Sequence, residues 1–192
     1  MAIIVVGGGG RGAGKTALIC GIVRALPEIS WTAIKITSHA HVKPTPIWQE
    51  TVAGDESDTA RYLAAGARRA LLVTASEDAL GPGDDTLGPI VEQVLRECPP
   101  PAGAIFESNS VLRCLRPDLC LAAASSLKGE HKPSYELVQQ RMDAMVELAG
   151  HDHIIDVEEI TFRLASMERV SPTMQEWLRE RLGERQGIVS SQ

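Results

Sequence analysis

Short apolar runs and segments of helical periodicity alternate along the chain. The first run, residues 3–6, is β-branched throughout and ends at four glycines, which is typical of a buried parallel strand entering a tight turn. Apolar residues then recur at helical spacing from Leu18 until Pro27 interrupts the pattern. The sequence therefore predicts a strand, a glycine-rich turn and a helix over residues 15–26.

The same alternation continues toward the C-terminus. Further strands are predicted at residues 32–37, 70–74, 104–107, 120–124 and 154–155. Further helices are predicted at residues 58–65, 87–95, 134–149 and 171–182, with Ser134 as an N-cap and Gly150 after the third of them. A long loop is expected after residue 37, through Gly54. This alternation predicts an α/β fold with a mostly parallel sheet and helices on both faces.

The residues after the first predicted strand form a complete phosphate-binding motif. They match GxxxxGK[ST], and they are Gly9, Gly10, Arg11, Gly12, Ala13, Gly14, Lys15 and Thr16. In this motif the glycines let backbone N–H groups turn toward an anion, and the helix N-terminus adds partial positive charge. Lys15 is expected to contact the β- and γ-phosphates of ATP or GTP, and the Thr16 hydroxyl to bind Mg²⁺. Arg11 either contacts phosphate or points to solvent.

The motif, placed between a strand and a helix, predicts a three-layer P-loop NTPase fold. In such sheets ligands bind beyond the carboxyl ends of the strands. The chain has 192 residues, of which 44% are hydrophobic and 23% charged, and these values fit one globular domain. We expect that domain to span residues 1–183, followed by a polar tail at residues 184–192.

Carboxylates at the predicted strand ends are candidate magnesium ligands. A P-loop site needs carboxylates to hold Mg²⁺, directly or through water, and to orient the group that attacks the γ-phosphate. Glu107 closes a predicted strand and is the strongest candidate, while Asp55 and Asp58 precede or begin a predicted helix. For Asp58 a role as helix N-cap is equally open. With Lys15 and Lys35, Asp58 and Glu107 make up the candidate catalytic residues.

Polar residues in and after the second predicted strand suggest a further function. Lys35 lies inside that strand, where a lysine is costly unless its amine reaches a phosphate, a carboxylate or water. His39 and His41 follow it and bind a metal, act on a substrate or are simply solvated. Two histidines alone make an incomplete metal site. In a metabolic enzyme, the candidates for binding a phosphoryl acceptor are Lys35, His39, His41 and Asn109.

The sequence gives little indication of which base the nucleotide carries. Asn109 is the only asparagine, so the Asn-Lys-x-Asp motif that recognises guanine in the Ras-like GTPases is absent. Lys128 and Glu130 follow a predicted strand, and they either recognise the base in a similar way or belong to a solvated loop. Both GTP and ATP therefore remain open.

Charge, apolar run length and cysteine content indicate which partners and which cellular compartment to expect. The net charge of −6 and the lack of a Lys/Arg run argue against a nucleic-acid partner. No apolar run approaches the ~20 residues that cross a bilayer, and no basic region precedes the first apolar run as in a signal peptide. Cys20, Cys98, Cys114 and Cys120 lack CxxC spacing, so we predict reduced, mostly buried thiols. A cytoplasmic protein without nucleic-acid or membrane partners is expected.

The motifs resemble, in order, those of the molybdopterin-guanine dinucleotide biosynthesis protein B (MobB) family, P-loop proteins grouped with dethiobiotin synthetase. The matching features are the phosphate loop, Ile34-Lys35 with His39 and His41, Asp58-Thr59 before Ala65-Gly66-Ala67, and Glu107. The similarity covers residues 2–110. The chain departs from the family in a longer loop at residues 44–55, in the missing lysine before Asp58, and in Ser108, which replaces a glycine.

The resemblance implies a GTP-binding, weakly hydrolysing accessory protein of molybdenum cofactor assembly. Such a protein would be a homodimer that docks on a guanylyltransferase, with Lys15, Thr16, Asp58 and Glu107 holding the Mg-nucleotide. The alternative is an ATP-dependent small-molecule kinase or ligase, whose acceptor would contact the enlarged loop at residues 42–55. A regulatory NTPase switch is a third possibility.

Overall fold

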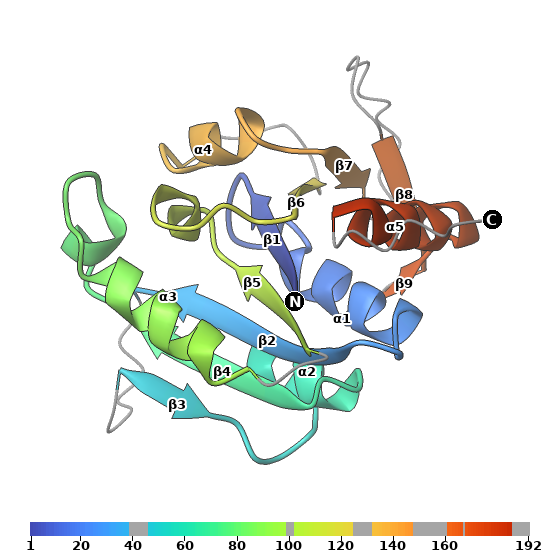
Figure 1. The fold of residues 1–192 in the computed structure, drawn as a ribbon, viewed down its shortest axis with the longest axis horizontal. Helices are drawn as coiled ribbons and strands as arrows, with labels where there is room; N and C mark the ends of the chain where they lie inside the picture. The colour runs from blue at the N-terminus through green and yellow to red at the C-terminus, as the bar shows by residue number, and fades with distance from the viewer. Residues whose placement is uncertain (39–45, 99–101, 125–131, 148–160, 167, 186–192) are drawn as a thin grey trace.

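One sheet forms the centre of the fold in the computed structural model, which describes residues 1–38, 46–98, 102–124, 132–147, 161–166 and 168–185. Its strands are β1 (Ala2–Gly8), β2 (Ser30–Thr37), β3 (Ile47–Gln49), β4 (Arg69–Thr74), β5 (Ala102–Glu107), β6 (Leu119–Ala124), β7 (Ala144–Glu147), β8 (Thr161–Ser166) and β9 (Arg169–Val170). Within the described ranges their order is β3-β4-β2-β5-β1-β6-β7-β8-β9 (Figure 1). Neighbours pair in parallel except the edge strands β3 and β9, which run antiparallel.

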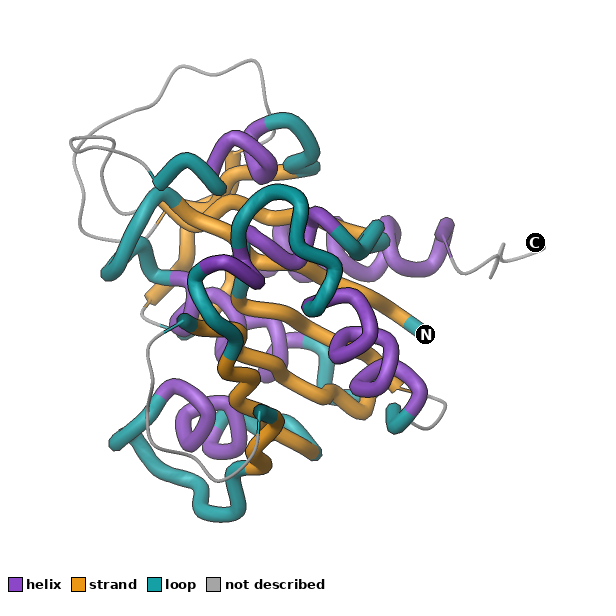
Figure 2. The backbone as a smooth tube through the Cα atoms, turned by 90° about the vertical axis from the view of Figure 1, so that its left-hand side faces the viewer, coloured by secondary structure: helices purple, strands orange, loops and turns teal. Residues whose placement is uncertain are grey.

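Helices cover both faces of this sheet (Figure 2). They are α1 (Lys15–Ala25), α2 (Asp58–Ala64), α3 (Leu87–Arg96), α4 (Tyr135–Gln139) and α5 (Pro172–Arg185), with short 3₁₀ turns η1 (Asp78–Leu80) and η2 (Ser110–Arg113). The predicted α/β architecture with a mostly parallel sheet is confirmed. So are the five predicted strands between residues 3 and 124, and four of the five predicted helices.

Two apolar layers follow from the alternation of side chains along the strands. On β1, Ile4 and Val6 belong to the layer under α1, α2 and α5, whereas Val5 belongs to the layer under α3, η2 and α4. These residues are 0% exposed, which explains why a parallel strand buried on both faces reads as a continuous apolar run. The centre of the sheet is therefore fixed by burial from both sides.

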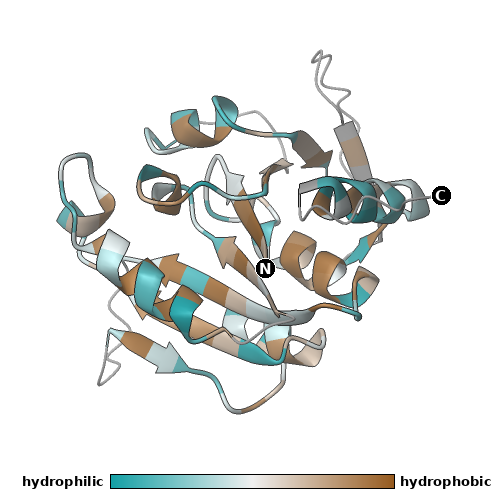
Figure 3. Ribbon diagram, in the orientation of Figure 1, coloured by the Kyte–Doolittle hydropathy of each residue, from teal (hydrophilic) through white to brown (hydrophobic). Residues whose placement is uncertain are grey.

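Helix α1 is more deeply buried than the other helices. Every residue from Ala17 to Val23 is buried, because β9 and α5 cover the side of α1 that faces away from the sheet. A Cβ atom on Gly21 would lie 3.3 Å from both the Glu168 carbonyl carbon and Val170 Cγ1, so glycine lets the strand approach closely. Figure 3 shows α1 as largely hydrophobic, whereas α3 carries many hydrophilic residues.

The helix predicted over residues 134–149 is wrong. The chain forms α4 for one turn, and residues 144–147 then form β7, which pairs in parallel with β6. Asp143 makes the change of direction, because its N–H donates to the Cys120 carbonyl at 2.7 Å and its carboxylate accepts from the Cys120 N–H at 2.8 Å. A short apolar run fits both the period of a helix and that of a strand. Here the segment became a strand because the free edge of β6 was available for pairing.

Besides β7, three strands were not predicted. β3 lies inside the predicted long loop, and β8 and β9 fall where no strand was expected. β3 has three residues and β9 two, so neither is long enough to show a period of two, and both exist through pairing with a neighbour. The strand predicted at residues 154–155 lies outside the described residues.

All four cysteines are free thiols, and three of them, Cys20, Cys98 and Cys120, are buried. Burial raises the pKa of Cys20 and of Cys120 to about 12. Because the thiolate is the reactive form, iodoacetamide at pH 8 should modify the exposed Cys114 first and leave the buried thiols intact until the protein is unfolded. Peptide mass spectrometry measures this, and modification of Cys20 or Cys120 as fast as Cys114 would contradict it.

Candidate phosphate and metal site

The phosphate loop leaves the sheet at its centre. β1 lies between β5 and β6, and its last residues pair with Ala122 and Ala123 of β6. In the loop Gly12 has a φ of 79° and Gly14 a φ of 87°, a left-handed conformation that glycine adopts without steric cost. Gly14 is also the N-cap of α1, and no side chain caps that end. The N–H groups of the first helical turn are thus available to an anion.

Lys15 lies over this loop rather than in open solvent. Its Nζ donates a hydrogen bond to the Gly10 carbonyl at 2.8 Å. Burial is the main cause of a lowered pKa at Lys15; Glu107 opposes the effect, and the like charges of Lys35 and Lys132 reinforce it. A cation that is desolvated and repelled in this way gains most when an anion binds beside it.

Three oxygen atoms from different elements converge at the mouth of the loop. The Thr16 Oγ1 atom at the start of α1 lies 3.0 Å from Asp58 Oδ1, at the start of α2. The same hydroxyl oxygen lies 2.8 Å from Glu107 Oε2, at the end of β5. A hydroxyl has one proton to donate, so it satisfies one of these two carboxylates at a time. The arrangement leaves unused acceptor capacity at this point.

Lys35, on the neighbouring strand β2, contacts the carboxylates of both Asp58 and Glu107. Lys35 and Glu107 are register partners on β2 and β5, and Lys35 Nζ lies 3.1 Å from Glu107 Oε1. The same amine donates to Asp58 Oδ2. Burial opposes the charge on Lys35, but Glu107 and Asp58 outweigh it and raise its pKa. Lys35 thus has the carboxylate partners that its position inside a strand requires.

Asp58 is not the N-cap of α2. Ser57 is, since its hydroxyl accepts from the Ala60 N–H at 3.1 Å. The Asp58 carboxylate is therefore directed to Thr16 and Lys35 instead. Burial raises the pKa of Asp58, but the hydrogen bond and charge of Lys35 outweigh burial, and the net pKa is lowered.

Tyr62 is a member of this cluster that the sequence analysis missed. Its hydroxyl donates to Glu107 Oε2, and the residue is 0% exposed. Burial, together with the Glu107 charge, raises the pKa of Tyr62 well above its usual value, so it stays a donor. The available signal was spacing, because Tyr62 follows Asp58 by one helical turn and residues four apart share a helix face.

The segment that begins at Lys132 is fastened to the phosphate loop. The Lys132 N–H donates to the Gly9 carbonyl at 3.2 Å. The Asn109 amide bonds both backbone groups of Gly8, at 2.9 and 3.0 Å, and lies 3.4 Å from Ser134 Oγ. The hydrogen bonds of Asn109 anchor the loop, so its predicted contact with an acceptor gains no geometric support. Lys132, whose side chain is exposed beside the loop, was not singled out from the sequence.

The remaining predicted site residues lie apart from this cluster or outside the described residues. Asp55 and Arg11 are exposed. Among the residues that the structure describes, no group of three or more His, Cys, Asp and Glu side chains is suited to a metal ion, so Asp55 does not join Asp58 and Glu107. The other four, His39, His41, Lys128 and Glu130, lie outside the described residues.

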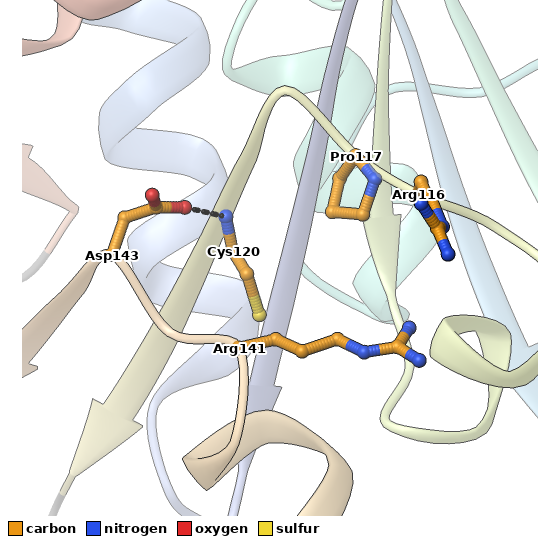
Figure 4. A pocket seen from close by; sticks show the side chains of 5 residues that line it. All are labelled: Arg116, Pro117, Cys120, Arg141 and Asp143. Atoms are coloured by element: carbon orange, nitrogen blue, oxygen red, sulfur yellow. Dashed lines mark hydrogen bonds between the residues drawn. The ribbon is translucent and has the colours of Figure 1, made fainter.

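A hollow of about 330 Å³ lies at the opposite ends of the strands from the phosphate loop (Figure 4). It is lined by Arg116, Pro117, Cys120, Arg141 and Asp143. Cys120 is near the start of β6 and Asp143 just precedes β7, so the hollow is at the amino ends of the strands. The phosphate loop is at their carboxyl ends, where ligands of such sheets bind.

Comparisons with known proteins support the fold and leave the family open. No model of a known protein family matches the sequence, and a search of curated proteins finds no significant match. Neither comparison therefore supports the resemblance to the MobB family. Among solved structures, LpxK from Aquifex aeolicus, crystallised as an "apo" form in complex with ATP, matches 97% of this chain. The match covers 68% of LpxK with a TM-score of 0.56 and 16% sequence identity.

A likeness at this identity concerns the fold. This chain has the α/β fold of P-loop NTPases, as its sequence predicted. No helix among the described residues is long and apolar enough to span a bilayer.

Proposed function

We propose that this chain binds a nucleoside triphosphate with Mg²⁺ and transfers or hydrolyses its γ-phosphoryl group, with ATP as the favoured nucleotide. One observation carries the proposal: oxygen atoms of Thr16, Asp58 and Glu107 converge beside Lys15 at an uncapped helix N-terminus. The complex of LpxK with ATP supports the choice of nucleotide, because that protein shares the fold over 97% of this chain.

The donor atoms present fit Mg²⁺. This ion takes oxygen ligands, keeps several waters and is commonly bound by one or two carboxylates together with substrate phosphates. Thr16, Asp58 and Glu107 supply a hydroxyl and two carboxylates. When bound there, the ion would neutralise charge on the β- and γ-phosphate oxygens.

Residues of the chain itself would bind the phosphates and orient the attacking group. Lys15 would bind the β- and γ-phosphates, since its amine already lies over the loop. Lys35 occupies the space between the two carboxylates, so it would shift toward the transferred phosphoryl group once those carboxylates bind a metal. Asp58, whose side chain is 31% exposed against 7% for Glu107, is the carboxylate better placed to orient an incoming hydroxyl or water.

A second candidate function is the GTP-binding, weakly hydrolysing accessory role implied by the resemblance to MobB. The observation that favours it is the order of the matching motifs, because Lys35, Asp58 and Glu107 of that pattern meet in one cluster. In this role the chain would form a homodimer and dock on the guanylyltransferase of molybdenum cofactor assembly. An ATP-dependent small-molecule kinase or ligase is expected instead if turnover depends on an acceptor.

Calorimetric titration of the full chain with ATP and with GTP, each with Mg²⁺ and with EDTA, tests the proposal. We expect saturable binding of ATP that weakens at least about tenfold without Mg²⁺, because an ion held by Thr16, Asp58 and Glu107 would neutralise charge on the phosphate oxygens. A clear preference for GTP would favour the accessory role. Failure to bind either nucleotide would overturn both candidates.

A further inference from the structure

A residue near the C-terminus reaches back to both helices that begin at the site. Glu168 lies between β8 and β9, and its carboxylate accepts from Arg24 Nη1 of α1 at 2.6 Å. It also accepts from Arg61 of α2, at 2.5 Å from Nη2 and 3.1 Å from Nε. These partners lie 144 and 107 residues away along the chain. Helices α1 and α2 carry Thr16 and Asp58 at their first turns.

The backbone of Glu168 is held in an unfavourable conformation. Its φ is 64°, and among the described residues it is the non-glycine residue with a positive φ. Such a conformation persists where the surrounding contacts impose it, and strained residues cluster at functional sites. Two arginine contacts and the close packing of the strand on Gly21 supply those constraints.

Arg61 contacts both Glu168 and a candidate metal ligand. Its Nη1 atom lies 3.8 Å from Asp58 Oδ1, the oxygen that faces Thr16. The shorter contacts of the guanidinium all go to Glu168, through Nη2 and Nε. Arginine and carboxylate form strong bidentate pairs when they are free to meet. Without Glu168, the same guanidinium would be free to close on Asp58.

We propose that Glu168 is a positioning residue for the divalent cation site, because it holds Arg61 and thereby leaves Asp58 Oδ1 available to the metal. The inference rests on the proposed function, since it assigns Asp58 to Mg²⁺. Lys35 already competes for the Asp58 carboxylate through Oδ2. A second tight cation at Oδ1 would compete with the metal for the remaining oxygen.

The electrostatics of the contact agree with this role. Burial opposes the charge on Glu168, but its hydrogen bonds to Arg61 and Arg24 outweigh burial and lower its pKa. Glu168 is therefore ionised at neutral pH and neutralises Arg61 next to the site. The interaction does more than tie the C-terminal strand to α2, because it determines which carboxylate the guanidinium prefers.

The test measures the Mg²⁺ concentration that half-saturates ATP binding in Glu168→Gln, Arg61→Gln and the double variant. We expect Glu168→Gln to raise this concentration about tenfold, because a bidentate arginine pair competes with the ion. Arg61→Gln should leave it at or below the wild-type value. The double variant should return to within about twofold of wild type, since the competitor is gone.

Arg24→Gln is the matched control, because it removes an arginine that binds Glu168 but, within the described part of the chain, forms no ion pair with Asp58. If Glu168 served only as an anchor, Arg24→Gln would mimic Glu168→Gln, and the double variant would be at least as impaired as either single one. Either result overturns the inference, as does an unchanged Mg²⁺ dependence in Glu168→Gln. An increase in the half-saturating concentration in Arg61→Gln alone would overturn it even if Glu168→Gln failed to fold.

The two proposals fail in different ways. If the wild-type chain binds ATP with Mg²⁺ and Glu168→Gln behaves identically, the proposed function stands and the role of Glu168 is wrong. If the wild-type chain shows no Mg²⁺-dependent binding of ATP or GTP, both are wrong.

Discussion

Lys15→Ala is expected to lower the affinity for ATP with Mg²⁺ about 100-fold or more, which corresponds to about 2.7 kcal/mol. The Lys15 amine lies over the loop at 2.8 Å from the Gly10 carbonyl, where the phosphates of a bound nucleotide would lie. A charge-assisted hydrogen bond contributes about 1.5–3 kcal/mol, and Lys15 would bond two phosphates. Calorimetric titration measures the loss directly.

The same change should not destabilise the protein without nucleotide. Burial lowers the pKa of Lys15 in the folded state, so its protonated form opposes folding at neutral pH, and stability rises as pH rises through the folded pKa. The alanine variant does not bury a protonated amine, so the urea concentration at its unfolding midpoint should equal or exceed that of the wild type. Arg96→Ala, which removes an exposed cation from α3, is the control and should bind normally. Wild-type affinity in Lys15→Ala would show that the loop does not bind phosphate.

Glu107→Gln is expected to reduce Mg²⁺-dependent turnover of the nucleotide about 100-fold or more, because it removes a carboxylate from the metal and phosphate site. Three donors, Thr16, Lys35 and Tyr62, contact the Glu107 carboxylate. An amide accepts through one oxygen only, so at least one of the three would face its NH₂ group. Phosphate release at saturating nucleotide measures the effect.

Glu107→Gln should also destabilise the fold by about 2 kcal/mol, because a largely buried cation loses one of its two partners. The raised pKa of Lys35 in the folded protein determines how this contribution depends on pH. The stabilisation from the Lys35–Glu107 ion pair is complete below the pKa that Lys35 has in the unfolded chain. It is lost as pH rises through the pKa of Lys35 in the folded protein. Urea unfolding at neutral and alkaline pH measures both. Glu92→Gln on the exposed side of α3 is the control. Unimpaired turnover in Glu107→Gln would exclude Glu107 from the reaction.

Local sequence was sufficient to predict the strand and the helix that flank the glycine-rich loop. A β-branched run that ends in glycines depends only on neighbouring residues, and β1 and α1 form where it predicted them. The end of β5 at Glu107 was predicted in the same way, from a short buried run. The N-cap of α2 is a detail that local sequence did not predict. Ser57 and Asp58 are adjacent and both suit an N-cap, and the choice between them depended on Lys35 and Thr16.

The helix predicted over residues 134–149 failed for a related reason. Val138, Met142 and Met145 have helical spacing, and nothing within that segment excludes a helix. The segment changes direction at Asp143 because the open edge of β6 accepts a parallel neighbour there. Pairing with a distant strand outweighed a weak local preference.

The chain by itself determined which chemical groups are present and where on each element they lie, because motifs and periodicity act over a few residues. Only the tertiary structure decided which groups meet. Thr16 joins Asp58 and Glu107 across 42 and 91 residues, and Glu168 joins Arg61 across 107. These contacts depend on the strand order β2-β5-β1 and on packing around α1. Burial and strand pairing over the whole fold set that order, which local spacing does not record.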